Sequence, residues 1–203
     1  HFLKLIPNPL KTIKTKLKTM LAYNNDPKLK KLILAEVIKH RKADQIVQRT
    51  YGQENGKWKG CAVGCSIHSL NIKLKKDFPT SDHSVYETEL GIPKELAYIE
   101  DALFEEMSVE DSKTWPERFL KAINPGADLS KVVAQWVIWE FEDKKAGLST
   151  IKEVQDDKEV MDWCKEVVAL YKRDLAGDKP TEDEYYQLYL KINGAGARAW
   201  AWA

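Results

Sequence analysis

Two cysteines and a histidine lie within eight residues of this sequence, in the stretch Trp58-Lys-Gly-Cys-Ala-Val-Gly-Cys-Ser-Ile-His68. If the stretch is helical, Cys61, Cys65 and His68 are spaced i, i+4 and i+7 and share one face. Thiolate sulfur and imidazole nitrogen bind zinc, and they also serve as nucleophile and base in cysteine enzymes. The spacing therefore predicts a site for metal binding or thiol chemistry at the start of a helix.

A metal site here would use Cys61, Cys65 and His68, with His40 or His83 as the fourth ligand, and zinc is the ion we expect. The usual zinc knuckle has the spacing Cys-x2-Cys, in which a tight turn brings both sulfurs to one ion. The spacing here is Cys-x3-Cys, which needs a helical platform and ligands from elsewhere in the fold. The metal hypothesis thus depends on which histidine the fold brings to this helix.

Thiol catalysis is the second hypothesis, with Cys61, Cys65, His68 and His83 as its candidate residues. Gly60 precedes Cys61 where a loop enters the helix, and a helix N-terminus stabilises a thiolate. His83 would then act as the base. Cys61 and Cys65 could alternatively form a reversible disulfide, although the i, i+4 spacing would strain it.

The same residues also fit a purely structural role. Small side chains occupy most of positions 61–66, and cysteine is among the most frequently buried residue types. A helix with such a face packs closely against its neighbours, so this interpretation needs no ligand.

The expected elements are helices throughout, and the predicted fold is an all-α, irregular bundle of about eight to nine helices. We expect helices over residues 9–20, 27–49, 61–75, 83–90, 93–107, 116–123, 129–144 and 150–175, and a last one after Thr181. In the second of these, His40 and Asp44 are spaced to share a face. In the fifth, Asp101 and Glu105 are expected to face solvent.

The composition fits a water-soluble globular protein, since 43% of the 203 residues are hydrophobic and 31% are charged. We expect one domain over residues 1–193 and an Ala-rich helical or frayed tail over residues 194–203. No apolar run is long enough for a transmembrane segment. Three cysteines argue against a disulfide scaffold and for the cytoplasm.

Positive charge is concentrated at the start of the chain. Residues 1–50 hold ten lysines and two arginines against three acidic residues, whereas the whole chain has a net charge of only +1. The basic residues of 4–31 therefore predict a surface that docks an acidic partner. The overall charge gives no indication of nucleic-acid binding.

The segments Gly-Cys-Ala-Val-Gly-Cys-Ser-Ile-His, Glu89-Leu-Gly-Ile-Pro93, Ile99-Glu-Asp-Ala-Leu-Phe-Glu105 and Trp115-Pro-Glu-Arg-Phe-Leu120 together resemble uncharacterised bacterial all-helical proteins. The resemblance covers about a third of the chain and implies no activity, cofactor or site residue. Our first functional hypothesis is accordingly a module that binds a protein partner or a small molecule. The alternative is a metal-binding or thiol-dependent enzyme centred on Cys61, Cys65 and His68.

Overall fold

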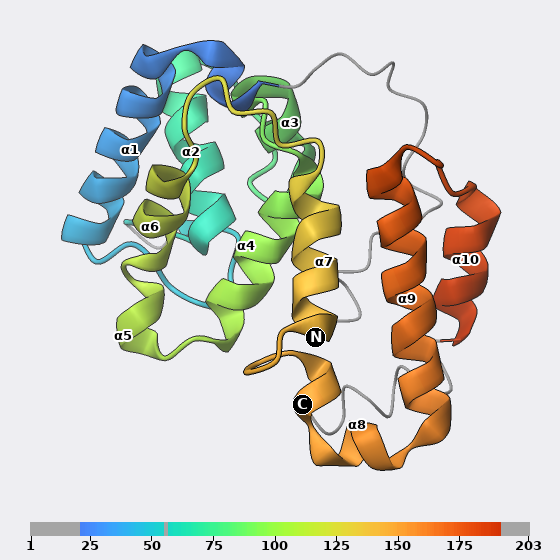
Figure 1. Cartoon of the computed structure of the whole chain (residues 1–203). Helices are drawn as coiled ribbons and strands as arrows, with labels where there is room; N and C mark the ends of the chain where they lie inside the picture. Colours follow the sequence, from blue (N-terminus) through green and yellow to red (C-terminus); the bar gives the residue numbers. More distant parts are fainter. Residues whose placement is uncertain (1–20, 55–56, 192–203) are drawn as a thin grey trace. The chain divides into compact units, whose positions relative to one another are not determined.

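The computed structural model describes residues 21–54 and 57–191. Within these residues the chain forms ten α-helices, eight of them of seven residues or more, and the only sheet is one short hairpin (Figure 1). The all-α prediction is confirmed. The expected helix over residues 9–20, most of the basic region 4–31, and the tail over 194–203 with its boundary at residue 193 lie outside the described residues.

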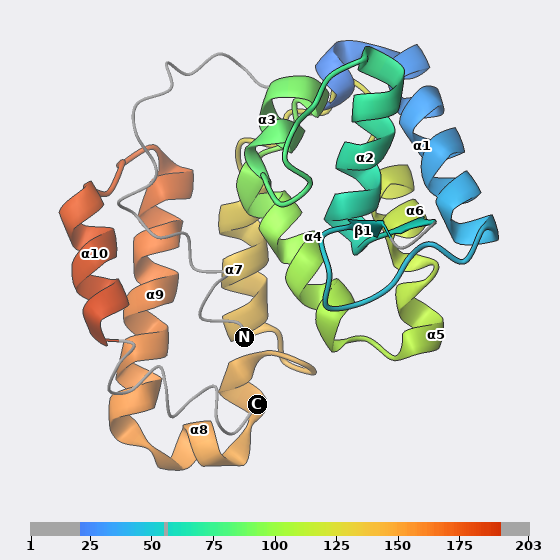
Figure 2. The same ribbon diagram turned by 180° about the vertical axis from the view of Figure 1, so that it is seen from behind.

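The described chain divides into two compact units, residues 21–130 and 131–191. In the first, the 3-10 turn η3 (Ala22–Asn25) and helix α1 (Pro27–Lys42) are followed by a hairpin of β1 (Gln53–Glu54) and β2 (Trp58–Lys59). Five helices complete this unit, namely α2 (Ala62–Leu74), α3 (Ser84–Leu90), α4 (Lys94–Glu106), α5 (Val109–Ser112) and α6 (Trp115–Ala122). Helix α2 packs against α1, α4 and α6, so it is the element around which this unit is built (Figure 2).

The helices of the first unit begin and end at residues whose side chains fit those positions. The carboxylate of Asp26 accepts a hydrogen bond from the backbone N–H of Lys28, and Pro27 occupies the first position of α1. Gly91 closes α3 in the left-handed conformation, with φ at 61°. An added Cβ at Gly91 would lie 2.3 Å from the carbonyl oxygen of Leu21, so only glycine fits there.

The turn η3 holds three consecutive residues, Tyr23, Asn24 and Asn25, at φ values of 54°, 52° and 57°. Left-handed backbone costs a residue with a side chain about 1–2 kcal/mol. Long-range hydrogen bonds offset this cost. The hydroxyl of the buried Tyr23 donates to the carbonyl of Leu120 at 2.6 Å, and the Asn24 amide donates to the carbonyl of Glu89 at 3.0 Å. The turn therefore ties the start of this unit to two distant segments.

The prediction that the helix beginning at Pro27 runs to Arg49 is wrong, because α1 ends at Lys42. Asp44 adopts a φ of 53°, and Ile46 then forms a parallel bridge with Gly60. Ile46, which the apolar pattern had assigned to a further helical turn, thus pairs with the segment before α2 instead.

The expected pairing of His40 with Asp44 is also wrong, since it required the helix to continue. Nδ1 of His40 lies 2.8 Å from Oε1 of Gln45, while Asp44 pairs with Lys113 at 3.0 Å.

The second unit contains α7 (Val132–Glu142), the 3-10 turn η4 (Leu148–Thr150), α8 (Lys152–Asp156), α9 (Lys158–Ala176) and α10 (Glu182–Lys191). The predicted single helix over residues 150–175 is interrupted at Asp157. The backbone of Asp157 is extended, and its carboxylate accepts a hydrogen bond from the N–H of Val160 at the start of α9. A capping carboxylate has therefore divided one expected helix into two.

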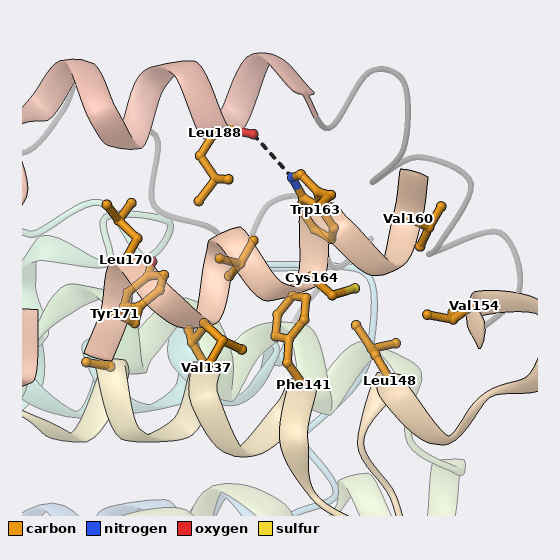
Figure 3. Packing of buried hydrophobic residues seen from close by; sticks show 13 residues of the cluster. Val137, Phe141, Leu148, Val154, Val160, Trp163, Cys164, Leu170, Tyr171 and Leu188 are labelled. Atoms are coloured by element: carbon orange, nitrogen blue, oxygen red, sulfur yellow. Dashed lines mark hydrogen bonds between the residues drawn. The ribbon is translucent and has the colours of Figure 1, made fainter. Parts of the chain in front are cut away.

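Helices α7 and α9 enclose an apolar cluster in which Val137, Phe141, Val160 and Trp163 are buried (Figure 3). The indole N–H of Trp163 donates to the carbonyl of Leu188 at 3.3 Å, which joins α10 to α9. None of the helices within residues 21–54 and 57–191 is long and apolar enough to cross a membrane.

Candidate functional site

Cys61 is the N-cap of helix α2: its backbone is extended, and its sulfur accepts a hydrogen bond from the N–H of Gly64 at 3.3 Å. The thiol therefore lies at the N-terminal end of a 13-residue helix, as the sequence predicted. It is also buried, with 1% of the residue exposed.

The loop before α2 is held in place by backbone pairing. The N–H of Cys61 donates to the carbonyl of Thr50 at 2.6 Å, and the N–H of Gly60 donates to the carbonyl of Gln45 at 2.9 Å. At Gly64 an added Cβ would lie 2.1 Å from the carbonyl oxygen of Tyr51. Glycine at this position thus lets the backbone of Tyr51 pack directly against the first turn of α2.

Helix α4 places two carboxylates beside this thiol. The sulfur of Cys61 and one oxygen each from Asp101 and Glu105 all lie within 4.8 Å of one another. Among the described residues, this is the only group of three or more potential metal ligands that come so close together. Asp101 and Glu105 are one helical turn apart on α4, so both face the start of α2.

Outer contacts orient both carboxylates. Oδ2 of Asp101 accepts a hydrogen bond from the Tyr51 hydroxyl at 3.1 Å and lies 3.3 Å from Nε2 of His83. The other ring nitrogen of His83 lies 3.0 Å from the carbonyl oxygen of Ser81. Both oxygens of Glu105 accept from the backbone N–H of Arg49. These contacts leave Oδ1 of Asp101 buried and without a hydrogen-bond partner.

The surroundings oppose a free thiolate at Cys61. Burial raises the pKa of this thiol far above its ordinary value, and the nearby charge of Asp101 raises it further. The pKa of the Glu105 carboxyl is raised as well, mainly by burial and partly by Asp101. A cation among these three groups would reverse the balance, because it attracts all three in their deprotonated forms.

A second set of buried polar groups lies on the adjoining side of α4. Glu100 is fully buried with Tyr86 and Ser66, and neither its two carboxyl oxygens nor the two hydroxyls make a hydrogen bond of good geometry. Burial raises the pKa of Glu100 well above its usual range, and the charge of Asp101 adds to the effect. Burial therefore favours the neutral, protonated form of Glu100.

The residues predicted from the sequence separate into different places. Cys61 lies with Asp101 and Glu105, and His83 contacts Asp101. The buried thiol of Cys65 faces the carbonyl of Gly60 at 3.3 Å. His68 and His40 lie together, with Nδ1 of His68 3.5 Å from Nε2 of His40. No three of Cys61, Cys65, His68 and His40 come within 4.8 Å of one another, so the structure does not assemble the predicted four-ligand set.

Asp101 and Glu105 are the site residues that the sequence analysis missed. The expectation that both face solvent is wrong for Asp101, of which 9% is exposed, and Glu105 is partly buried. Their i, i+4 spacing was the available signal, but the same spacing is common on ordinary solvent-facing helices.

Comparison with known proteins gives no family for this chain. No family model matches the sequence, and neither the curated proteins nor the solved structures contain a significant match. The function is therefore argued from the site alone.

Proposed function

We propose that residues 21–130 form a metal-binding module that holds a zinc-class ion with Cys61, Asp101 and Glu105. The observation that carries this proposal is the approach of these three ligand atoms within 4.8 Å of one another, with Oδ1 of Asp101 buried and unpartnered beside them. A buried polar atom without a partner costs about 1–3 kcal/mol. Coordination of an ion by Oδ1 would remove that cost.

The ligand types and their supports fit zinc. Zinc binds cysteine sulfur at about 2.3 Å and carboxylate oxygen at about 2.0–2.2 Å. In a tetrahedral site, those bond lengths place the ligand atoms roughly 3.4–3.6 Å apart, so a closure of about 1 Å by side-chain rotation would complete the set. Tyr51 and His83 would hold Asp101 in position, as outer hydrogen bonds commonly do around metal ligands.

Three protein ligands leave a fourth tetrahedral position for water, which is the arrangement of catalytic zinc sites. A zinc ion bound in this way lowers the pKa of its water and polarises substrate oxygens. Tyr51, whose hydroxyl donates to Asp101, is an exposed residue, which supports a centre within reach of solvent. The alternative of thiol catalysis has less support, because the Cys61 sulfur accepts a hydrogen bond from the N–H of Gly64 and lies beside Asp101 and Glu105, and none of its hydrogen-bond partners among the described residues is a histidine.

Cobalt and zinc titration of the purified protein tests the proposal. We expect one equivalent of Co²⁺ to produce a thiolate-to-cobalt charge-transfer band, and we expect Zn²⁺ to abolish it. Cys61→Ser should remove the band without unfolding the protein, because serine is a good N-cap. Asp101→Asn and Glu105→Gln should weaken binding.

Matched controls come from the same chain. Glu106, next to Glu105, is exposed, and Cys164 lies in the second unit, so Glu106→Gln and Cys164→Ala should bind cobalt like the parent protein. If the parent shows no charge-transfer band, or if the control variants lose it together with the site variants, the proposal is wrong. The band should strengthen as pH rises, because the Cys61 thiol must lose its proton to bind the ion.

The location and the partner remain proposals based on the sequence. We propose a cytoplasmic location, which the three free thiols support. Docking of an acidic partner on the basic region 4–31 has support in the described residues only from Lys28 and Lys31, whose side chains are exposed. Lys30 makes a contact within the unit instead, since its ammonium donates a hydrogen bond to the carbonyl of Lys121 at 2.8 Å.

A further inference from the structure

Two histidines from different helices meet at the contact between α1 and α2. Nδ1 of His68 lies 3.5 Å from Nε2 of His40, and the ring centroids are 5.3 Å apart. The indole of Trp58 stacks on His68, with centroids 4.0 Å apart and planes inclined by 5°, and it also contacts His40 at 5.1 Å. This packing fixes the orientation of both imidazoles. The pair shares no residue with the centre at Cys61, Asp101 and Glu105.

The hydrogen bond between His40 and Gln45 resembles the one that supports a metal-bound imidazole. Oε1 of Gln45 lies 2.8 Å from Nδ1 of His40, so the proton of a neutral ring belongs on Nδ1 and the lone pair on Nε2. Metal-ligating histidines usually donate their other ring N–H to a carbonyl or carboxylate oxygen in this way. His40 is buried, and burial lowers its pKa, which favours the neutral ring that binds metals.

The separation of the two nitrogens also fits shared coordination. At a metal–nitrogen distance of about 2.0–2.1 Å, two imidazoles on one tetrahedral ion have their nitrogens roughly 3.3–3.4 Å apart. The observed 3.5 Å is close to that separation, and a shared ion would replace the direct contact between the two nitrogens after a small rotation of the rings. Glu36 is the charged group whose field acts on His40, and its carboxylate is paired with Lys39 and Lys73.

We propose that Nε2 of His40 and Nδ1 of His68 bind a divalent transition metal through imidazole alone. The ions that suit such a site are Ni²⁺, Cu²⁺ and Zn²⁺, with water in the remaining positions. His68 is partly exposed, which gives these waters access. This second metal site does not depend on the zinc site of the proposed function.

Trp58 provides a reporter for the test, because a bound Ni²⁺ would lie next to its ring and quench its fluorescence. The titration uses the full chain with Cys61→Ser, which lacks the thiolate ligand of the first site. We expect about one equivalent of Ni²⁺ to quench part of the emission, and Zn²⁺ to displace it and restore the signal. His40→Gln and His68→Gln should abolish both effects. Gln45→Ala should weaken binding by about 10–100-fold.

Trp58→Phe is the matched control, since it should keep nickel binding by calorimetry while losing the quenched component. Far-ultraviolet circular dichroism of each variant establishes that it is folded. If folded His40→Gln and His68→Gln bind Ni²⁺ and quench like the parent, the proposal is overturned. Quenching that persists in Trp58→Phe would overturn it too. Failure of the first site would appear instead as a missing cobalt charge-transfer band in the unmutated chain.

Discussion

Replacement of Gly64 by alanine separates the intrinsic preferences of the chain from its tertiary packing. In an isolated helix, the change from glycine to alanine is favourable by about 0.8–1.0 kcal/mol. In this protein the new Cβ would lie 2.1 Å from the carbonyl oxygen of Tyr51 and 2.9 Å from its carbonyl carbon. Because the atoms it meets belong to the backbone, the whole Tyr51 segment must move by more than about 1 Å to reach ordinary van der Waals contact.

That movement would cost more than the helix gains. Overpacking costs about 1–3 kcal/mol, and displacement of this segment also breaks the hydrogen bond from Cys61 N–H to Thr50. A backbone hydrogen bond contributes about 1 kcal/mol. We therefore expect Gly64→Ala to lower the free energy of unfolding by about 1–3 kcal/mol after the gain in helix propensity is subtracted. Cobalt affinity should fall as well, because the Tyr51 hydroxyl would move away from Asp101.

Urea denaturation followed by circular dichroism measures the stability change, and cobalt titration measures the binding change. Gly177→Ala is the control, since an added Cβ at Gly177 has nothing within 4 Å and its backbone has a φ of 91°. It should show only the cost of a left-handed alanine, about 1 kcal/mol, with unchanged cobalt binding. If Gly64→Ala is as stable as the parent or more stable, then Tyr51 does not pack against α2 as described.

Three further predictions concern stability. The parent should lose stability as pH rises above about 4.5, because the raised pKa of Glu100 makes the folded state hold a proton that the unfolded chain releases, and Glu100→Gln should remove this loss. Urea denaturation across pH 4–8 measures the free energy of unfolding, and the same pH dependence in parent and variant would contradict the prediction. Tyr23→Phe should cost about 1–3 kcal/mol, since it leaves the carbonyl of Leu120 buried without its donor, and thermal unfolding would show the decrease. Trp163→Phe should destabilise the second unit and loosen α10, through loss of the hydrogen bond to Leu188 and of buried volume; faster hydrogen exchange in α10 is the expected result.

The sequence by itself determined the fold class and most helix positions. Apolar periodicity, together with caps such as Asp26-Pro27 and the Thr181–Glu184 capping box, is local information. The start of a helix at Cys61 followed from the same kind of signal. These features were predictable because each depends on residues within one or two turns of one another.

Tertiary structure alone decided which reactive groups meet. The i, i+4, i+7 spacing placed Cys61 and His68 on one helix, yet Cys61 faces α4 and His68 faces α1. Helix α2 packs against several helices, so residues of one predicted face contact different neighbours. The sequence predicted that Asp101 faces solvent, but in the folded structure it is buried and accepts a hydrogen bond from the Tyr51 hydroxyl. The end of α1 at Lys42 was decided in the same way, since Ile46 pairs with Gly60. Contacts between segments far apart in the chain carry no local signature, so only the folded structure shows which charges and thiols share a site.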